Sequence, residues 1–333
     1  TTNFTSDDVS VTNGALSAFS PSSSTVYTAT FTPSGDGACT IDVGGDVYTD
    51  NTGNGNDASN QFTWTYDGAQ PLMMITAEAG KVVFSGDASN DASLSLTFTS
   101  SEPTTDFVSG DVTVANGTLS NIAATSSTVY TATFTPTSDG VCTIDVAAAA
   151  FTDPAGNDNV ASLQFTWTSD STSPTMTIAA AEVTSGETSD DALLSLTFTS
   201  SETTTDFVFS DVMVTNGTLS NFSPTSSAEY TAIFTPTSDG ACTIDVGSNV
   251  YTDAVGNGNV ASVQFTWTYD SPYVFTDATI QGGVDDWVAD PVTATATYGE
   301  ISTWDVSQVT NMSSLFANKT TFNDDICAWD VSN

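Results

Sequence analysis

The 333-residue chain carries 40 acidic residues against two basic ones, Lys81 and Lys319, and it contains no histidine. A net charge of −38 at pH 7 excludes ordinary binding to nucleic-acid phosphates, which needs Lys and Arg, and disfavours docking to anionic lipid. Salt or bound cations must relieve this self-repulsion, so we expect an extracellular setting that is saline or rich in calcium.

A long segment recurs three times, starting at Asp36, Asp139 and Asp239, and its second copy reads DGVCTIDVAAAAFTDPAGNDNVASLQFTW. The copies are 103 and 100 residues apart, as measured on matched residues: Cys39, Cys142, Cys242, Trp64, Trp167 and Trp267. A period of about 100 residues is too long for a solenoid unit and suits one small β-sandwich. The sequence therefore predicts a string of similar β domains.

The recurring segments set the domain boundaries. We predict a first repeat at residues 1–67, a second at 68–170, a third at 171–270, and a different module, here called the tail, at 271–333. The opening TTNFTSDDVSVTNG aligns with the interior of the later repeats, so we expect the first repeat to lack its opening strands. The chain is thus expected to be a slice of a longer protein or a processed product.

Within the second repeat, apolar residues alternate with Ser and Thr in short runs between Gly, Asn, Asp and Pro, which is typical of half-buried strands. Asn116-Gly117 is predicted to be a tight hairpin turn, and a three-residue insertion near Lys81 to be a loop. The alternating positions are Leu94, Leu96, Phe98, Val112, Val114, Tyr130, Ala132, Phe134, Cys142, Ile144, Val146, Leu163, Phe165 and Trp167. About seven strands per 100 residues indicate an antiparallel sandwich.

The order SE…TTDF…DVTVxNGTLS…YTATFTP…DGxCTIDV…TDxxGN…FTW resembles the bacterial Ig-like repeats of large adhesins and surface proteins, from residue 1 to about 270. This resemblance implies a mainly β fold of tandem Ig-like antiparallel sandwiches. It also implies a stalk on the outside of a cell, often with calcium at the domain junctions.

The tail has another pattern. Asp277 is predicted to cap a helix over 278–289, and Pro291 to begin a second, weak helical turn. Isoleucine and tryptophan then recur every 25 residues, at Ile301, Ile326, Trp304 and Trp329. The segment is similar to BspA-like surface-protein repeats, WDVSxVTNMxxLFxxxxxFNxDIxxWDVS. That similarity implies a helical cap and the beginning of a leucine-rich-type solenoid, in which the tryptophans would stack.

Calcium takes about six to eight oxygen ligands, and short-spaced Asp and Asn can supply several of them. The turn 153–157, with Asp170 after the last strand and Glu202 in the next domain, is predicted to form one ligand set. The complete prediction is Asp153, Asn157, Asp170 and Glu202, with the equivalent sets Asp50, Asn54, Asp67 with Glu102, and Asp253, Asn257 with Asp270. The alternative is that these residues only build turns.

Cys142 shares its strand face with Ile144 and Val146, so we predict a small buried hydrophobe, with an intermolecular disulfide as the alternative. The tryptophans are expected in the core, with a sugar-stacking platform as the alternative. Acceptor sites for N-linked glycans are predicted at Asn3, Asn116, Asn216, Asn221, Asn311 and Asn318, of which Asn116 and Asn216 are expected in exposed hairpin turns.

No arrangement typical of catalysis is present, because histidine and arginine are lacking and the acidic residues recur in every repeat. We therefore predict that the chain is not an enzyme. The leading interpretation is an extracellular structural or adhesive repeat protein that forms a calcium-stiffened stalk or filament, with neighbouring copies or surface glycans as partners. The alternative is a carbohydrate- or ligand-binding module displayed on an Ig-like stalk. No apolar run is long enough for a membrane helix.

Overall fold

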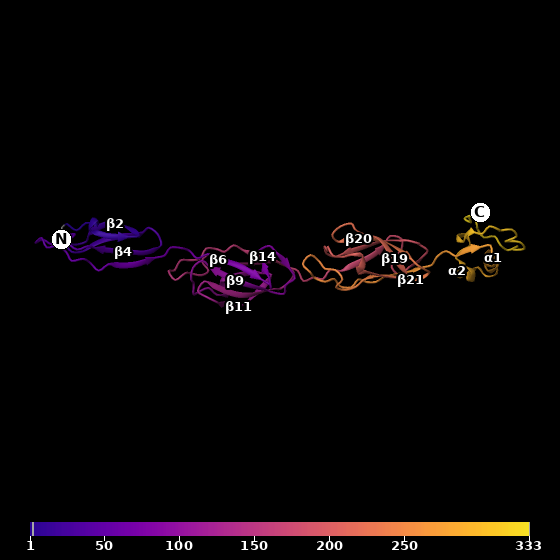
Figure 1. Cartoon of the computed structure of the whole chain (residues 1–333), viewed down its shortest axis with the longest axis horizontal. Coiled ribbons are helices and arrows are strands. Elements are labelled where there is room, and N and C mark those ends of the chain that lie inside the picture. The colour runs from indigo at the N-terminus through magenta and orange to yellow at the C-terminus, as the bar shows by residue number, and fades with distance from the viewer. Residues whose placement is uncertain (2, 333) are drawn as a thin grey trace. The chain divides into compact units, whose positions relative to one another are not determined.

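The structure is a computed structural model that describes residues 1 and 3–332. It divides into two compact units, one that ends at Ser171 and another that starts at Thr172. Strands account for 43% of the residues and helices for 9%, so the mainly β prediction is confirmed. Figure 1 shows the repeats as successive groups of strands and the helices in the tail alone.

The second repeat is complete. Its strands are β6 (Met73–Glu78), β7 (Val82–Val83), β8 (Ala88–Ser89), β9 (Leu94–Ser100), β10 (Val112–Ala115), β11 (Gly117–Ala124), β12 (Val129–Pro136), β13 (Gly140–Val146) and β14 (Phe165–Ser169). They form one sheet with the order β11-β12-β9-β6-β7 and another with the order β10-β13-β14-β8. All pairs are antiparallel except β14 with β8. The insertion near Lys81 forms the turn that leads into the edge strand β7.

The core of the second repeat lies between these sheets. Leu94, Leu96 and Phe98 face inward from β9, and each is at most 1% exposed. From the opposite sheet, the indole of Trp167 meets the ring of Phe134 edge-on, with their centroids 6.1 Å apart. Burying such side chains contributes about 1.5–3 kcal/mol each. Leu163 was predicted to share this pattern but lies outside β14 and is 89% exposed, because the strand begins only at Phe165.

The predicted Asn116-Gly117 hairpin is wrong. β10 pairs with β13 and β11 pairs with β12, so the dipeptide carries the chain from one sheet to the other. Asn116 has a φ of 54°, which asparagine tolerates better than most residues. A Cβ at position 117 would lie 2.1 Å from Cζ of the buried Phe134 ring and 2.8 Å from the Thr135 carbonyl oxygen, so this corner requires glycine.

The third repeat copies this architecture. Its strands are β15 (Met176–Ala180), β16 (Thr188–Ser189), β17 (Leu194–Ser200), β18 (Val212–Thr215), β19 (Gly217–Pro224), β20 (Glu229–Pro236), β21 (Gly240–Val246) and β22 (Phe265–Tyr269). The sheet orders are β15-β17-β20-β19 and β16-β22-β21-β18. No described residue of this repeat forms an equivalent of β7, as expected from its shorter loop.

The first repeat has fewer strands than the second and third. It consists of β1 (Val9–Thr12), β2 (Gly14–Pro21), β3 (Tyr27–Pro33), β4 (Gly37–Val43) and β5 (Phe62–Tyr66). These strands make a β1-β4-β5 sheet and a β2-β3 sheet, and no described residue of the repeat corresponds to β6 or β9. As a result, Trp64 is 41% exposed although its equivalent Trp167 is fully buried.

The tail contains β23 (Val274–Thr276), α1 (Ile280–Ala289), α2 (Pro291–Tyr298) and β24 (Asp305–Gln308). The two helices confirm the predicted helical segment. Asp277 does not cap α1, because the residue that directly precedes this helix is Thr279. The Asp277 carboxylate instead accepts hydrogen bonds from the backbone N–H groups of Thr310 and Asn311, at 2.7 and 2.9 Å. Single 3-10 turns occur at Ser6–Asp8, Ser109–Asp111, Phe209–Asp211 and Ile301–Thr303.

The indoles of Trp304 and Trp329 stack with centroids 6.0 Å apart and planes 15° from parallel, as the 25-residue spacing predicts. They belong to a small core that also includes Phe275, Val284 and Trp287. The leucine-rich-type solenoid itself is not confirmed and stays a prediction. Across residues 1 and 3–332, neither α-helix has the length and apolar character needed to cross a membrane.

Candidate functional site: an acidic cluster at a domain junction

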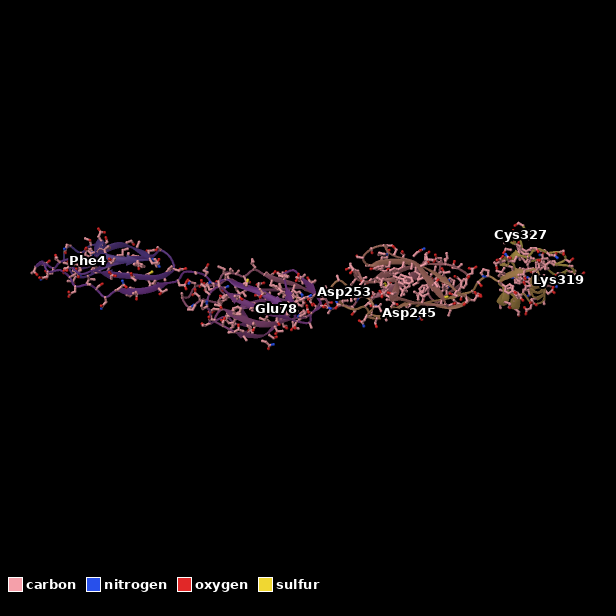
Figure 2. All side chains as sticks on the ribbon, in the orientation of Figure 1. Phe4, Glu78, Asp245, Asp253, Lys319 and Cys327 are labelled. Carbon is pink, nitrogen blue, oxygen red and sulfur yellow. The ribbon has the colours of Figure 1, made fainter. Side chains whose placement is uncertain are left out.

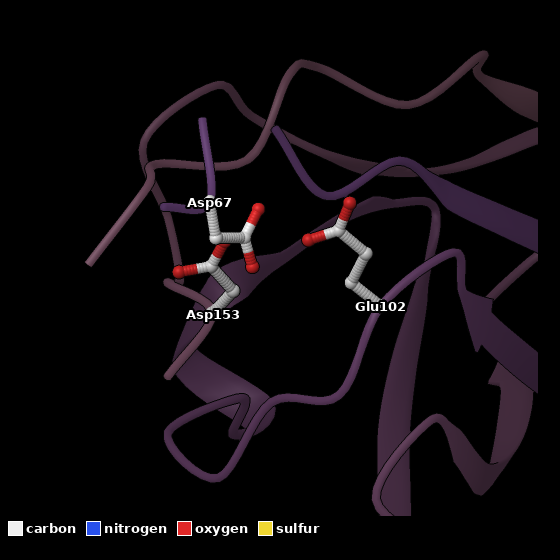
Figure 3. A group of neighbouring side chains, drawn as sticks. All are labelled: Asp67, Glu102 and Asp153. Carbon is white, nitrogen blue, oxygen red and sulfur yellow. The ribbon is translucent and has the colours of Figure 1, made fainter. Parts of the chain in front are cut away.

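Three carboxylates meet where the first repeat joins the second. Asp67 follows β5, Glu102 follows β9, and Asp153 lies in the loop between β13 and β14. Each offers an oxygen within 4.8 Å of the others, and Figure 3 shows Glu102 turned toward the two aspartates. We call Asp67, Glu102 and Asp153 the junction cluster. Glu102 is half-buried and Asp153 is buried.

The Asp153 loop is held by its own hydrogen bonds. The backbone N–H of Asn157 donates to Oδ1 of Asp153 at 2.9 Å, and Nδ2 of Asn157 donates to Oδ2 at 2.8 Å. Gly156, at a φ of 92°, closes the turn by donating to the Asp153 carbonyl oxygen at 3.1 Å. The sequence DPAGN therefore fixes the Asp153 carboxylate in one orientation before any ligand arrives.

The linker between the first and second repeats, residues 67–70, is hydrogen-bonded to the Asp153 loop. Nδ2 of Asn157 also donates to the Asp67 carbonyl oxygen at 3.0 Å, and Nε2 of Gln70 donates to the Asp158 carbonyl oxygen at 3.2 Å. On the other side, the backbone N–H of Gly68 donates to Oδ1 of Asp36 in the first repeat at 2.8 Å. The linker therefore carries Asp67 to the second repeat while remaining bonded to the first.

The cluster is electrostatically strained when it is fully ionised. Partial burial raises the pKa of Glu102, and the negative charges of Asp67 and Asp153 raise this pKa further. Burial also acts to raise the pKa of Asp153, but hydrogen bonds from Asn157, Gly156 and Ala155 outweigh it and leave the pKa of Asp153 below its ordinary value. Three oxygen donors that repel one another fit a hard divalent cation such as calcium, which prefers carboxylate ligands.

The ligand sets predicted from the sequence are only partly reproduced. Asp67 and Glu102 come together as expected, but Asp153 completes their group in place of Asp50 and Asn54, which are exposed. Asp50 accepts hydrogen bonds from Thr52 and Asn54, and these bonds hold the pKa of Asp50 well below its ordinary value. The Asp50 loop is therefore a turn outside the groups of acidic residues found in the described chain.

In the third repeat, Glu202 and Asp253 offer carboxylate oxygens within 4.8 Å of each other, as Glu102 and Asp153 do. Asp253 is held by Asn257, whose backbone N–H and Nδ2 donate to it at 2.9 and 2.8 Å. Asp170, the sequence equivalent of Asp67, lies near the end of the other compact unit. Asp270 follows β22 and is not grouped with Asp253 among the described residues. Calcium binding by any of these residues stays a prediction.

The predicted glycan acceptors differ in how accessible their side chains are. Nδ2 of Asn116 donates to the Ser138 carbonyl oxygen at 2.9 Å and lies 3.6 Å from Sγ of Cys142. Nδ2 of Asn216 makes the equivalent contacts with Ser238 and Cys242 at 2.7 and 3.5 Å. Both asparagines are half-buried at the corner between the sheets, not exposed in a hairpin turn. Exposed side chains are found at the other sites: Asn3, Asn221, Asn311 and Asn318.

The repeat cysteines behave as predicted. Cys39, Cys142 and Cys242 are buried free thiols, and burial raises the pKa of Cys142 and of Cys242. Cys327 in the tail is an exposed free thiol, and Figure 2 marks its position. Trp167 and Trp267 lie in the cores at 0% and 2% exposure, so the sugar platform is not formed by these two residues.

Sequence reasoning missed a cavity that occurs in all three repeats. Cavities of about 510, 570 and 510 Å³ lie beside Tyr27, Tyr130 and Tyr230, and none of their lining residues is acidic. Hydroxyl groups and aromatic rings line them, for example Phe207 and Phe209 in the third repeat. The repeated TTDF and TTNF motifs at the rim were the signal available in the sequence.

Comparison with solved structures returns distant matches. Invasin, a bacterial integrin-binding protein, is 13% identical over 79% of this chain and 52% of its own, with a TM-score of 0.37. The Yersinia pseudotuberculosis adhesin InvE is 18% identical over 55% and 56%, with a TM-score of 0.21. The surface layer protein SbsC is 16% identical over 81% and 51%, with a TM-score of 0.22. The chain thus spans about half the length of these structures. No curated protein matches it.

Comparison with protein families is more informative. Residues 274–333 match a family described as a Mycoplasma protein of unknown function. Residues 1–66, 70–168 and 170–269 each match the family described as the bacterial Ig-like domain. These three matches cover most of the sequence and coincide with the β-sandwich repeats. The chain therefore belongs to the bacterial Ig-like domain family.

Proposed function

We propose that this chain is an extracellular structural and adhesive repeat protein of a cell surface, in which tandem Ig-like domains form a stalk or filament. Membership of the bacterial Ig-like domain family and the near-identity of the repeats support this role. An active site is expected once in a chain, whereas the acidic residues here recur with each repeat. We further propose that calcium binds at the junctions and stiffens the stalk.

The junction cluster is the observation that carries the calcium proposal. Asp67 belongs to the linker, whereas Glu102 and Asp153 belong to the second repeat, so a cation that is bound by all three ties the linker to that repeat. The carboxylates of Asp67, Glu102 and Asp153 would hold the ion. Its positive charge would remove their mutual repulsion, and extracellular modules bind calcium with dissociation constants of about 10⁻⁴ to 10⁻³ M.

Hydrogen–deuterium exchange with and without about 2 mM calcium tests this directly, a concentration above the dissociation constants typical of such modules. Calcium should slow exchange of the backbone amides at residues 67–70 and 153–158. Asp153→Asn should abolish the effect, because it removes a central ligand. Asp50→Asn is the matched control: it alters the same type of turn without touching the cluster, so protection should persist. Equal exchange with calcium and chelator, or equal loss in both variants, would contradict the proposal.

The neutral cavities favour the alternative function, a ligand-binding module on the stalk. In a chain with 40 acidic residues, three cavities without an acidic lining residue suit an uncharged ligand such as a neutral glycan. A glycan array probed with the whole chain separates the two functions. Binding that is lost in Phe209→Ala would assign a ligand to the third repeat, whereas an empty array leaves the spacer role.

A further inference from the structure

The sequence contains five Asn-Gly pairs, and the structure places them in different surroundings. An asparagine followed by glycine can lose its side-chain amide without an enzyme, because glycine has no Cβ to keep its backbone nitrogen away from the asparagine side chain. The pairs begin at Asn13, Asn54, Asn116, Asn216 and Asn257. The contacts of each asparagine decide whether its side chain is able to react.

Three of the pairs lie at the corners between the two sheets of each repeat, where the asparagine is held through both side-chain atoms. Asn13, Asn116 and Asn216 are half-buried there. In the second repeat, Nδ2 of Asn116 donates to the Ser138 carbonyl oxygen at 2.9 Å, and Oδ1 accepts from the Ser138 hydroxyl at 2.7 Å. The other two corners have equivalent bonds. A side chain fixed in this way does not turn its carbonyl carbon toward the next backbone nitrogen.

Asn54 is held through its nitrogen alone and is exposed. Its Nδ2 donates to Oδ2 of Asp50 and to Oγ1 of Thr52, both at 2.9 Å. Among the described residues, no group donates to Oδ1 of Asn54, and the N–H of the exposed Gly55 donates to no acceptor. The nitrogen that would attack and the oxygen that would take up charge during the attack are therefore both free of competing hydrogen bonds.

The fold itself requires the glycine of this pair. A Cβ at position 55 would lie 2.1 Å from Oδ1 of Asp46, and the third repeat has the same close approach of a glycine to a polar side chain. The second repeat has Ala149 in place of Asp46, and there Asp158 occupies the position of Gly55. The side chain opposite therefore determines whether the asparagine of this turn is followed by glycine.

We propose that Asn54 is a site of spontaneous modification, at which the chain converts this asparagine into aspartate and isoaspartate. The backbone nitrogen of Gly55 attacks Cγ of Asn54. The N–Cγ bond forms as the Cγ–Nδ2 bond breaks, and Nδ2 leaves as ammonia with the proton that Gly55 loses. Water then opens the cyclic imide. Cleavage of the bond from the nitrogen to Cγ gives aspartate, whereas cleavage of its bond to the main-chain carbonyl carbon gives isoaspartate.

The conversion alters the turn that Asn54 closes. The Nδ2 donor to Asp50 is lost, and a second carboxylate takes its place beside the first. In isoaspartate the main chain also runs through Cγ, which displaces the carbonyl oxygen of residue 54 that accepts from the Asp50 N–H at 3.0 Å. Like charges at such a separation repel, so each conversion adds a negative charge and loosens the turn.

Mass spectrometry of the whole chain, incubated at mildly alkaline pH where the glycine nitrogen loses its proton more readily, tests the proposal. Chymotryptic cleavage after aromatic residues gives matched peptides from the three repeats: 49–62, 152–165 and 252–265. We expect Asn54 to gain the mass difference between amide and acid first. Half-buried Asn257 should follow, and Asn157, which precedes Asp158, should be last. No conversion of Asn54 in the time that a synthetic peptide of residues 49–62 converts, or equal conversion of Asn157, would overturn the proposal.

Paired variants separate the glycine from the rest of the turn. Asp46→Ala combined with Gly55→Asp reproduces the arrangement of Ala149 and Asp158, and should abolish conversion of Asn54. Asp46→Ala alone keeps the glycine and should convert as the unmodified chain does. Asn54→Gln should also abolish conversion, because the extra methylene moves the amide away from the attacking nitrogen. Conversion at position 54 that persists in the double variant or in Asn54→Gln, or that stops in Asp46→Ala alone, would overturn the assignment.

Discussion

At the scale of single residues, Glu102 is a member of the junction cluster whose ionisation its surroundings disfavour. Its pKa is raised by partial burial and by the charges of Asp67 and Asp153. A raised pKa in the folded state means that the protonated form fits the fold better. This contribution to stability is complete below the ordinary value of 4.5 and is lost as the pH rises through the raised pKa.

Glu102→Gln should therefore stabilise the second repeat at pH 7 in calcium-free buffer, because the amide mimics the protonated acid. We expect a rise in melting temperature of roughly 1–5 °C, measured by scanning calorimetry. Below pH 4.5 the difference from the unmodified chain should disappear. Glu78→Gln, which removes an exposed carboxylate elsewhere on the same repeat, should have little effect. A lower melting temperature for Glu102→Gln at pH 7 would contradict the electrostatic account.

At the scale of secondary-structure elements, the start of helix α2 is fixed by two residues, the N-cap Asp290 and the first helical residue Pro291. The Asp290 carboxylate accepts hydrogen bonds from the backbone N–H groups of Val292 and Thr293 at 3.2 and 3.3 Å, and from the Thr293 hydroxyl at 2.7 Å. Pro291 occupies the first helical position, where no N–H is required. Together these residues end α1 and start α2 within a single peptide unit.

Asp290→Ala should loosen α2, since it leaves two N–H groups without a side-chain acceptor. We expect hydrogen exchange of the α2 amides to accelerate about fivefold, the usual effect of losing a helix cap. Asp290→Asn keeps an acceptor oxygen and should remain close to the unmodified chain. If both variants exchange alike, the cap does not stabilise this helix.

The strands were predictable from the sequence because their apolar residues alternate, and Leu94, Leu96 and Phe98 are buried as the pattern indicates. The pairing partners of each strand could not be predicted from the sequence. A period of two shows which face is buried but not which strand lies alongside, so the sheet corner at Asn116 looked like a hairpin. Likewise, local sequence favoured Asp277 as a helix cap, whereas a contact 33 residues away, with Thr310, fixes its carboxylate.

The site was predictable in its residue types and less so in its grouping. Asp67, Glu102 and Asp153 all appeared in the predicted ligand sets, because Asp and Asn are the residues that turns and calcium sites share. The sets mixed loops from opposite ends of the sandwiches. Placing a loop at one end or the other requires the course of every strand between Glu102 and Asp153, and composition does not carry that information.

At the scale of the whole molecule, the net charge of −38 opposes folding. Among the described residues, the ion pair of Lys319 with Asp285 is the only salt bridge, so screening must come from solvent ions. The screening length falls from about 30 Å at 0.01 M salt to about 8 Å at 0.15 M. Repulsion between carboxylates on different strands should weaken accordingly.

Raising sodium chloride from about 0.01 M to 0.15 M should therefore raise the melting temperatures of the repeats, measured by scanning calorimetry. Sucrose at matched osmolality, which does not screen charge, is the control and should not reproduce the increase. Unchanged or lower melting temperatures in salt would show that the acidic residues are already neutralised by protons or tightly bound cations.

If the glycan predicted at Asn116 is attached, the geometry of this corner requires that its attachment precede folding. A glycosylated amide nitrogen retains one hydrogen, whereas Nδ2 of Asn116 uses both of its hydrogens, toward Ser138 and Cys142. A transferase that acts on this asparagine must therefore reach the nascent chain before β10 and β11 separate into their sheets. Asn221 is exposed, so a transferase could modify it after the domain has folded. The time between synthesis and folding would then decide which acceptor sites are used.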